Sequence, residues 1–463
     1  MTTAPLPRPS RRDLLRSAWN GFAMLPLAHL AGRGGDGAQA RHHTPRARSI
    51  IFLYMDGGPS SVDLFDWKPR LLAEDGKPFA LPMEPTQFNN NGNTLGPRAT
   101  FRQHGDSGQW ISDRLPHLAR QADRLCVVRS MVSNFSEHTN ANYFLHTGHG
   151  LQGRPSLGAW IGYGLGSDAC DLPAFVVLNG GLIPPGGVDN FHSGFLPAHS
   201  QGSLFRMKGD AVANIAPHET KPDIQRRKVA LVQALDAQAR VADGADDGLD
   251  AAIKNHELAF RMQAAVPELV DMSRESRHLQ TLYGLDDDYE PTRTFARQCL
   301  LARRLVERGV RFVELTCPDT GNDRWDQHNN LGRGLEQNSR MVDQPIAALL
   351  CDLEARGLLD ETIVLFGGEF GRTPFAQGKN GRDHNPFGFT MWMAGGGFRP
   401  GTAYGETDEY GYKATVDPVS LHDLHATLLW QLGIDHERFT YRFGGRDLRL
   451  TDVYGRVVRK LLC

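Results

Sequence analysis

The sequence predicts an α/β fold built on a mostly parallel sheet that is covered by helices. Two observations predict it. Short apolar runs of strand length alternate along the chain with longer segments in which apolar residues recur at helical spacing, and this alternation is typical of parallel sheets with helical connections. The apparent strands also stop sharply, at glycines or before polar loops.

The predicted elements follow in chain order. The first is a buried strand at Ile50–Met55, a continuous apolar run that ends at Asp56, Gly57 and Gly58. Glycines at this point stop the strand and begin a turn. The later elements are a helix over 294–308, a strand at 310–316, a polar loop at 323–330, a helix over 339–356, strands at 362–366 and 389–394, and a helix over 421–432.

Length and composition exclude several classes of protein. The chain has 463 residues, 40% of them hydrophobic and 22% charged, which is typical of a globular enzyme-sized protein. A net charge of -2 argues against a nucleic-acid partner. No uncharged apolar run reaches the roughly 18 residues of a membrane span. The six cysteines form no C-x-x-C pair, so a zinc ribbon is not indicated.

The first forty residues have the order of parts of a twin-arginine export signal. Ser10 is followed by Arg11 and Arg12, then by an apolar stretch over 18–30 and a small-x-small motif at 38–40. We therefore expect residues 1–40 to be removed after export by the twin-arginine machinery, and the protein to be periplasmic or secreted. The alternative is an ordinary basic tail. The mature chain is then one domain, 41–463.

Residues 221–284 form a helix-rich insertion within this domain. A polar segment at 242–248 divides it into two parts. We interpret the insertion as a helical cap rather than an independent domain.

Ligand-type side chains stand at the ends of the predicted strands. The residues are Asp56, Asp326, His328, Glu369 and His384. Because the carboxyl ends of parallel strands meet at one edge of a sheet, we expect these side chains to converge. Carboxylates and imidazoles together suit zinc, manganese or iron, whereas calcium prefers oxygens alone. For each residue by itself, the alternative is a solvated acid or a histidine with a structural role, and the structural role is our interpretation of His422 and His425.

Seven motifs carry a resemblance to a known family. They are Met55-Asp56-Gly57-Gly58-Pro59-Ser60, Phe65-Asp66-Trp67-Lys68-Pro69, Arg129-Ser130-Met131, His146-Thr147-Gly148, Trp325-Asp326-Gln327-His328, the stretch Glu369 to Pro374, and Arg382-Asp383-His384. With them, nearly all of the mature chain resembles an uncharacterised bacterial family of exported sulfatase-like proteins, catalogued as a domain of unknown function. This family is similar to the alkaline phosphatase and sulfatase superfamily. The resemblance implies an alkaline-phosphatase-like three-layer sandwich.

The resemblance also implies a site with two divalent ions. Asp56, Asp326, His328, Glu369 and His384 match ligand positions, while Phe370 stands where the superfamily has a histidine. The position of the superfamily nucleophile, counted back from Thr147-Gly148, falls on His138 and Thr139. Either Thr139 is the nucleophile, or His138 is a metal ligand that replaces the imidazole missing at Phe370. Arg372, Arg382 or Lys68 would neutralise an anionic substrate.

Two functions follow from this pattern. One is a metal-dependent hydrolase that acts on sulfate or phosphate esters of an anionic small molecule or glycan. The alternative is a catalytically inactive member that binds a metal or a glycan in the periplasm or at the cell surface, as Phe370 and the absence of a cysteine nucleophile suggest. A serine hydrolase of the G-x-S-x-G type is a weaker alternative, because no serine has that setting.

Overall fold

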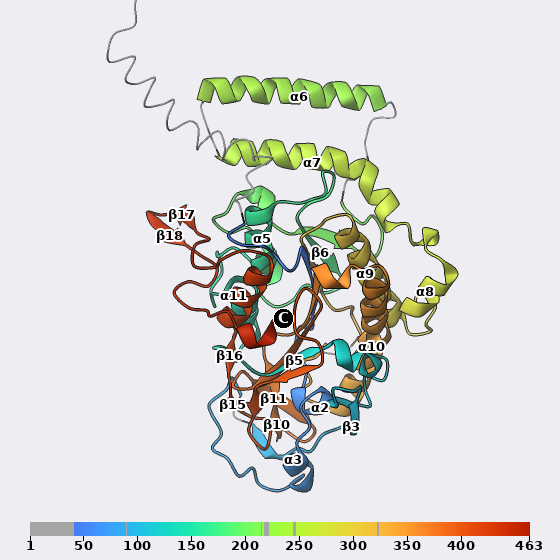
Figure 1. Cartoon of the computed structure of the whole chain (residues 1–463), viewed down its shortest axis with the longest axis vertical. Coiled ribbons are helices and arrows are strands. Elements are labelled where there is room, and N and C mark those ends of the chain that lie inside the picture. Colours follow the sequence, from blue (N-terminus) through green and yellow to red (C-terminus); the bar gives the residue numbers. More distant parts are fainter. Residues whose placement is uncertain (1–40, 89, 214, 217–221, 244–246, 322–323) are drawn as a thin grey trace, which may run out of the picture.

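The computed structural model in Figure 1 describes residues 41–463 except 89, 214, 217–221, 244–246 and 322–323. The predicted export signal, 1–40, therefore lies outside the described residues. The centre of the molecule is a nine-stranded sheet with the order β13-β5-β12-β9-β1-β8-β6-β7, in which β16 also pairs with β5. Its strands are β1 (Ser49–Tyr54), β5 (Cys126–Val132), β6 (Phe175–Asn179), β7 (Ser203–Arg206), β8 (Phe312–Leu315), β9 (Thr362–Gly367), β12 (Phe389–Ala394), β13 (Thr402–Tyr404) and β16 (Val419–Ser420).

The sheet is mostly parallel, as the sequence predicts. The central strand β1 pairs in parallel with β8 on one side and with β9 on the other. Only β12 pairs antiparallel to its neighbours, β5 and β9, among the described strands of this sheet. All six residues of β1 are buried, which explains why this strand is a continuous apolar run rather than an alternating one.

Helices cover both faces of the sheet, and this confirms the three-layer α/β architecture. Successive side chains of a strand point to opposite faces. Ile51 and Leu53 of β1 join the core beneath α9 and α10, whereas Ile50 and Phe52 join the core beneath α5 and α11. Figure 1 shows these two pairs of helices on opposite sides of the sheet. The helices are α4 (His138–Thr147), α5 (Leu157–Leu165), α9 (Glu290–Glu307), α10 (Leu331–Ala355) and α11 (Leu421–Gln431).

The long helix α10 begins at Leu331, earlier than the predicted 339. Its first turns contain Gly332 and Gly334, and glycine disfavours a helix interior by about 1 kcal/mol relative to alanine. Packing outweighs this local preference, because Leu331 is buried beside Leu95 and Ala376 and Leu335 is buried in the main core.

A second, smaller sheet was not expected from the sequence. It has the order β11-β10-β2 and consists of β2 (Asn91–Thr94), β10 (Gly371–Gln377) and β11 (Gly381–Asn385). Every residue of β10 and β11 is buried. Short strands form three hairpins: β3 (Phe101–His104) with β4 (Gln109–Ser112), β14 (Glu406–Thr407) with β15 (Ala414–Val416), and β17 (Tyr441–Phe443) with β18 (Arg446–Leu448). Two short helices, α2 (Ser61–Leu64) and α3 (Pro69–Ala73), follow β1.

The described part of the predicted insertion contains three α-helices, α6 (Pro222–Asp243), α7 (Asp247–Val270) and α8 (Arg277–Tyr283). The second half of α7 packs on the main core through Met262, Val266 and Leu269. In Figure 1 the α6–α7 hairpin lies at the top of the molecule, whereas β10 and β11 lie at the bottom. The hairpin is therefore distant from the strands that carry the candidate site described below. None of the described helices is both long and apolar enough to cross a bilayer.

Candidate metal centre

The turn after β1 brings two distant segments together. Gly57 and Gly58 have φ angles of 102° and 78°, in the left-handed region that favours glycine. A Cβ atom at Gly57 would lie 2.6 Å from the backbone nitrogen of Asp326. Glycine at this position therefore permits the loop that carries Asp326 and His328 to pack directly against the end of β1.

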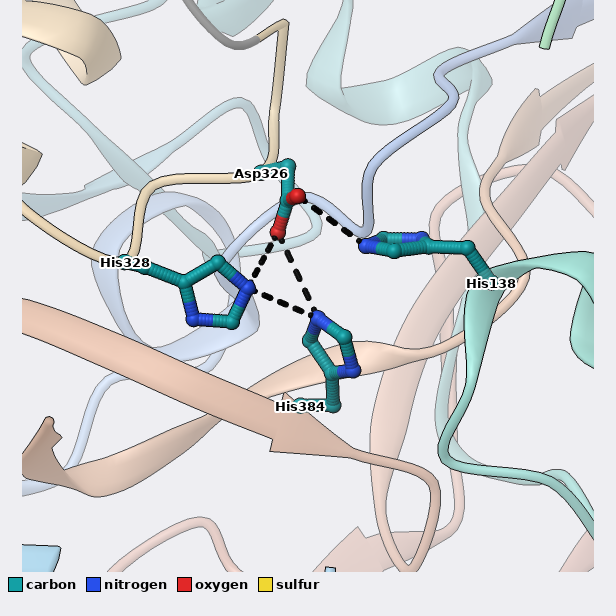
Figure 2. Close-up of side chains that lie close together, drawn as sticks. All are labelled: His138, Asp326, His328 and His384. Carbon is teal, nitrogen blue, oxygen red and sulfur yellow. Dashed lines mark hydrogen bonds and ion pairs between the residues drawn. The ribbon is translucent and has the colours of Figure 1, made fainter. Parts of the chain in front are cut away.

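Four side chains from three regions converge beside this turn. They are His138 at the start of α4, Asp326 and His328 in the loop before α10, and His384 in β11, and one ligand atom of each lies within 4.8 Å of the others (Figure 2). The Oδ1 atom of Asp326 lies 2.8 Å from Nε2 of His328 and 3.4 Å from Nε2 of His384. The other carboxylate oxygen, Oδ2, lies 3.1 Å from Nε2 of His138.

The outer nitrogen of each imidazole is held by an oxygen acceptor. His138 Nδ1 lies 2.7 Å from Oε1 of Glu369, and His384 Nδ1 lies 2.6 Å from the carbonyl oxygen of Ser136. His328 Nδ1 contacts the side-chain oxygen of Gln377. Since these oxygens accept hydrogen bonds, each Nδ1 carries a proton and the Nε2 of a neutral ring keeps its lone pair. Histidines that bind metals are oriented in this way by their surroundings.

The distances between ligand atoms fit a metal ion. The two Nε2 atoms of His328 and His384 lie 3.0 Å apart, and two lone pairs at this distance repel each other unless a cation lies between them. Zinc binds imidazole nitrogen at roughly 2.0–2.1 Å, so a tetrahedral site has ligand atoms about 3.3 Å apart. The triangle formed with Asp326 Oδ1 has sides of 2.8, 3.0 and 3.4 Å. The partly buried His/Asp group can therefore hold a metal.

Charge and burial set the protonation of this group. Burial opposes ionisation of Asp326, but the Arg372 guanidinium and the three histidines hold the pKa of its carboxyl well below its usual range. Burial lowers the pKa of His384 to about 4, against the opposing effect of Asp326. Burial also acts against the charge of His138, but the carboxylates of Asp326 and Glu369 raise its pKa to about 9. His138 is therefore protonated on both ring nitrogens in the metal-free chain. A metal bound at Nε2 would displace the proton there.

Asp56 and Glu369 lie next to this group but contribute no atom to it. The Glu369 carboxylate is fully buried, and its Oε1 accepts a hydrogen bond of 2.9 Å from the Gly57 amide in addition to its contact with His138. Asp56 is 1% exposed, and its Oδ2 lies 2.5 Å from a terminal nitrogen of Arg324. Burial raises the pKa of Asp56 to about 7, and Arg324 acts against this rise.

The structure places the three predicted substrate-binding cations differently from our expectation. Arg372 is fully buried, and its guanidinium donates to the carbonyl oxygens of Gly57 and Gly58 as well as to Asp326. Arg372 is therefore placed to fix Asp326. Arg382 is also fully buried and forms a bidentate ion pair with Asp63. This ion pair holds α2 against β11. Lys68 lies 3.1 Å from the buried Asp66.

Thr139 is the second residue of α4, and its amide donates a 3.0 Å hydrogen bond to Glu137. Burial opposes ionisation of Glu137, but the Thr139 and Asn140 amides and the Thr139 side chain lower the pKa of its carboxyl. Thr139 thus belongs to the cap of α4. Phe370 is buried and stacks on His384, with 4.5 Å between the ring centroids. It forms an apolar wall where the resemblance implies an imidazole.

Sequence reasoning missed the ion pair between Arg324 and Asp56. The two residues are far apart in the chain, and the only local signal is that Arg324 stands two positions before Asp326. The sequence predicts a functional role for Asp56 at the end of its strand, but it does not indicate that Arg324 is its partner.

The model of the family described as "Protein of unknown function (DUF1501)" matches residues 47–462. No curated protein is significantly similar to the chain. Among solved structures, the chain is similar to the sulfatase PsFucS1 from Pseudoalteromonas sp., with a TM-score of 0.34, 12% identity and coverage of 93% of this chain and 73% of that chain.

Two further solved structures show a similarity of the same degree. The phosphonate monoester hydrolase SpPMH from Silicibacter pomeroyi has a TM-score of 0.36 and 13% identity, over 75% of this chain and 71% of that chain. A protein in the alkaline phosphatase superfamily from Vibrio parahaemolyticus has a TM-score of 0.35 and 8% identity, over 86% of this chain and 69% of that chain.

Proposed function

The chain belongs to the DUF1501 family of proteins of unknown function, and from this premise we propose that it is an exported, metal-dependent hydrolase of sulfate or phosphate esters. One observation carries the proposal: three imidazoles, each with its Nδ1 held by an oxygen, turn their Nε2 atoms toward the carboxylate of Asp326. The site is open on one side, because the side chains of Asp326 and His328 are 29% and 23% exposed.

The residues around the ligands have separate tasks in this proposal. His138, Asp326, His328 and His384 hold the ion, and Arg372 keeps Asp326 ionised and in place. Glu369 and Ser136 fix two of the rings. When bound, a divalent cation supplies Lewis-acid polarisation of the oxygen atoms of a phosphate or sulfate ester. Phe370 excludes water from the inner side of the rings of His138 and His384.

Three nitrogens and one carboxylate suit zinc, manganese or iron. The second ion that the resemblance implies would need Asp56 and Glu369 as ligands. Asp56 is ion-paired with Arg324, and the charge of this guanidinium opposes a second ion at the same carboxylate.

One observation favours the alternative, a metal- or glycan-binding protein without turnover. Thr139, the candidate nucleophile, is engaged with Glu137 at the start of α4. A binder would keep the metal ligands, and it would lack a free hydroxyl for attack on an ester.

Metal analysis and two ester assays test the proposal. The purified chain is loaded with zinc, manganese or iron, its metal content is measured, and hydrolysis of an aryl sulfate and an aryl phosphate is followed. We expect a stoichiometric metal and hydrolysis of at least one ester, with both lost in His384→Ala. His422→Ala is the matched control, since His422 is buried and donates to the Gly148 carbonyl outside the centre. A chain that binds none of these metals contradicts the proposal, and a metal-loaded but inactive chain favours the binder.

A further inference from the structure

Arg324 has the most exposed side chain of the four cationic residues described for this site, ahead of Lys68, Arg372 and Arg382. Its side chain is 19% exposed, whereas those of Arg372 and Arg382 are fully buried. The N–H groups of Arg372 and Arg382 donate hydrogen bonds to carbonyl oxygens and carboxylates within the chain. Lys68, with its amine between Asp66 and the carbonyl oxygen of Thr407, is likewise engaged.

Arg324 is held firmly by its backbone. Its carbonyl oxygen accepts hydrogen bonds from the side chains of Gln327 and Asn338. The next residue, Trp325, is buried, and its amide donates a 3.3 Å hydrogen bond to the carbonyl oxygen of Asp56. The guanidinium is therefore anchored at the end of β1, and it is not a freely moving surface group.

The partner of Arg324 lies at the edge of the metal centre. Asp56 is 1% exposed, and neither of its carboxylate oxygens has a hydrogen-bond partner among the described residues, although Oδ2 is ion-paired with Arg324. The charges of Glu369, His138 and Asp326 all act on this carboxylate. A buried carboxylate in such a setting needs a cation, and the ion pair at 2.5 Å supplies one.

We propose that Arg324, and not a second metal ion, neutralises Asp56, and that the outer N–H groups of Arg324 bind an anionic oxygen of the substrate ester. A guanidinium has five N–H donors in a planar fork, and Asp56 is the one partner of its side chain among the described residues. A divalent ion bound to Asp56 would be repelled by the guanidinium at close range. This inference rests on the proposed function and names the group that recognises the phosphate or sulfate.

Two measurements on the purified full chain test the inference. The first is the number of metal ions bound per chain at saturation. The second is the affinity of the metal-loaded chain for inorganic phosphate and for sulfate, measured by calorimetry. The variants are Arg324→Ala, Arg324→Lys and Asp56→Asn. The control is Arg124→Ala, which removes an arginine that is ion-paired with Glu354 on α10.

We expect one ion per chain in the wild type. Phosphate should bind at least about 10-fold more weakly to Arg324→Ala, the loss typical of a charge-assisted hydrogen bond, and Arg324→Lys should recover part of this affinity. Asp56→Asn should keep the ion and bind phosphate at least as tightly, because it releases Arg324 without removing a metal ligand. Arg124→Ala should behave as the wild type.

Each contrary result has a distinct meaning. Two ions in the wild type, loss of the ion in Asp56→Asn, or unchanged phosphate affinity in Arg324→Ala would each overturn the inference, and all three leave the proposed hydrolase standing. A wild type that binds no ion contradicts the proposed function instead. The phosphate titration of that ion-free chain and of Arg324→Ala then still decides the role of Arg324.

Discussion

The buried carboxylate of Glu369 lies 2.7 Å from Nδ1 of His138 and so turns Nε2 of that ring toward Asp326. The same carboxylate oxygen accepts a hydrogen bond from the Gly57 amide. One side chain thus joins the loop after β9, the turn after β1 and the start of α4. The glutamate that we expected to be a direct ligand is placed to orient another ligand.

We predict that Glu369→Gln weakens metal binding by about 10- to 100-fold without unfolding the chain, as is usual when a group that orients a ligand histidine is changed. Competition with a chelator measures the affinity, and circular dichroism checks the fold. Glu354→Gln, at the exposed end of α10, is the control. An unchanged affinity would show that the Glu369–His138 contact has no part in metal binding, and complete loss of the ion would show direct ligation.

The sequence predicts β1, β9 and β12, because these buried strands are continuous apolar runs. It does not predict β6, although this strand is also apolar and buried except for its last residue. It misses β10 and β11, since the inner side chains of these strands include Arg372 and Arg382, which are buried only because acceptors elsewhere in the fold satisfy them. Such acceptors are carbonyl oxygens that a sequence pattern does not reveal.

The same limit applies to the site. Asp326, His328 and His384 stand at predicted strand ends or beside them, and the structure brings them together. His138 was pointed to by the family resemblance alone, because nothing in its local sequence marks it as a ligand. The role of Arg324 depends on its ion pair with Asp56, which lies in a distant segment of the chain. A single sequence does not show which distant segments come into contact.

A pH dependence of stability is expected from His425. Burial, and then the neighbouring His422, lower the pKa of His425 to about 3. Its Nε2 donates a 2.7 Å hydrogen bond to the Leu145 carbonyl and so holds α11 to α4. A depressed pKa in the folded state means that the stabilisation is fully present above the unfolded value of about 6.5 and is lost as the pH falls toward the folded value.

Urea unfolding of the wild type and of His425→Gln at pH 7.5 and pH 4.5 measures this effect. We expect the free energy of unfolding of the wild type to fall more than that of the variant, by up to about 2 to 3 kcal/mol over this interval. Equal losses in the two proteins would show that His425 does not titrate differently in the folded and unfolded states.

Export is predicted to depend on the arginine pair near the N-terminus. Replacing Arg11 and Arg12 together by lysine should leave the chain in the cytoplasm, because the pair is the distinctive feature of a twin-arginine signal. Cell fractionation followed by immunoblotting measures the distribution, with Arg8→Lys as the control outside the motif. Unchanged delivery of the double variant would refute the assignment of residues 1–40.

His138 and Thr139 are adjacent in the chain, and substitutions of the two separate attack by water from attack by a side chain. Nε2 of His138 lies 3.1 Å from Asp326 within the group of four ligands. Thr139 faces Glu137 in the helix cap instead. We therefore expect His138→Ala to weaken metal binding by at least about 100-fold, more than the loss of an orienting group, and to abolish ester hydrolysis.

Thr139→Ala keeps the backbone amide that donates to Glu137, so the variant should fold, bind the metal normally and retain its rate within about 10-fold. A covalent route through the threonine hydroxyl predicts the opposite, a metal-loaded variant without turnover, because the nucleophile itself is removed. Metal content and single-turnover hydrolysis, measured on both variants, decide between the routes. If His138→Ala keeps its metal, the ligand assignment fails whatever Thr139→Ala does, since a ring 3.1 Å from Asp326 would then serve only as its counter-ion.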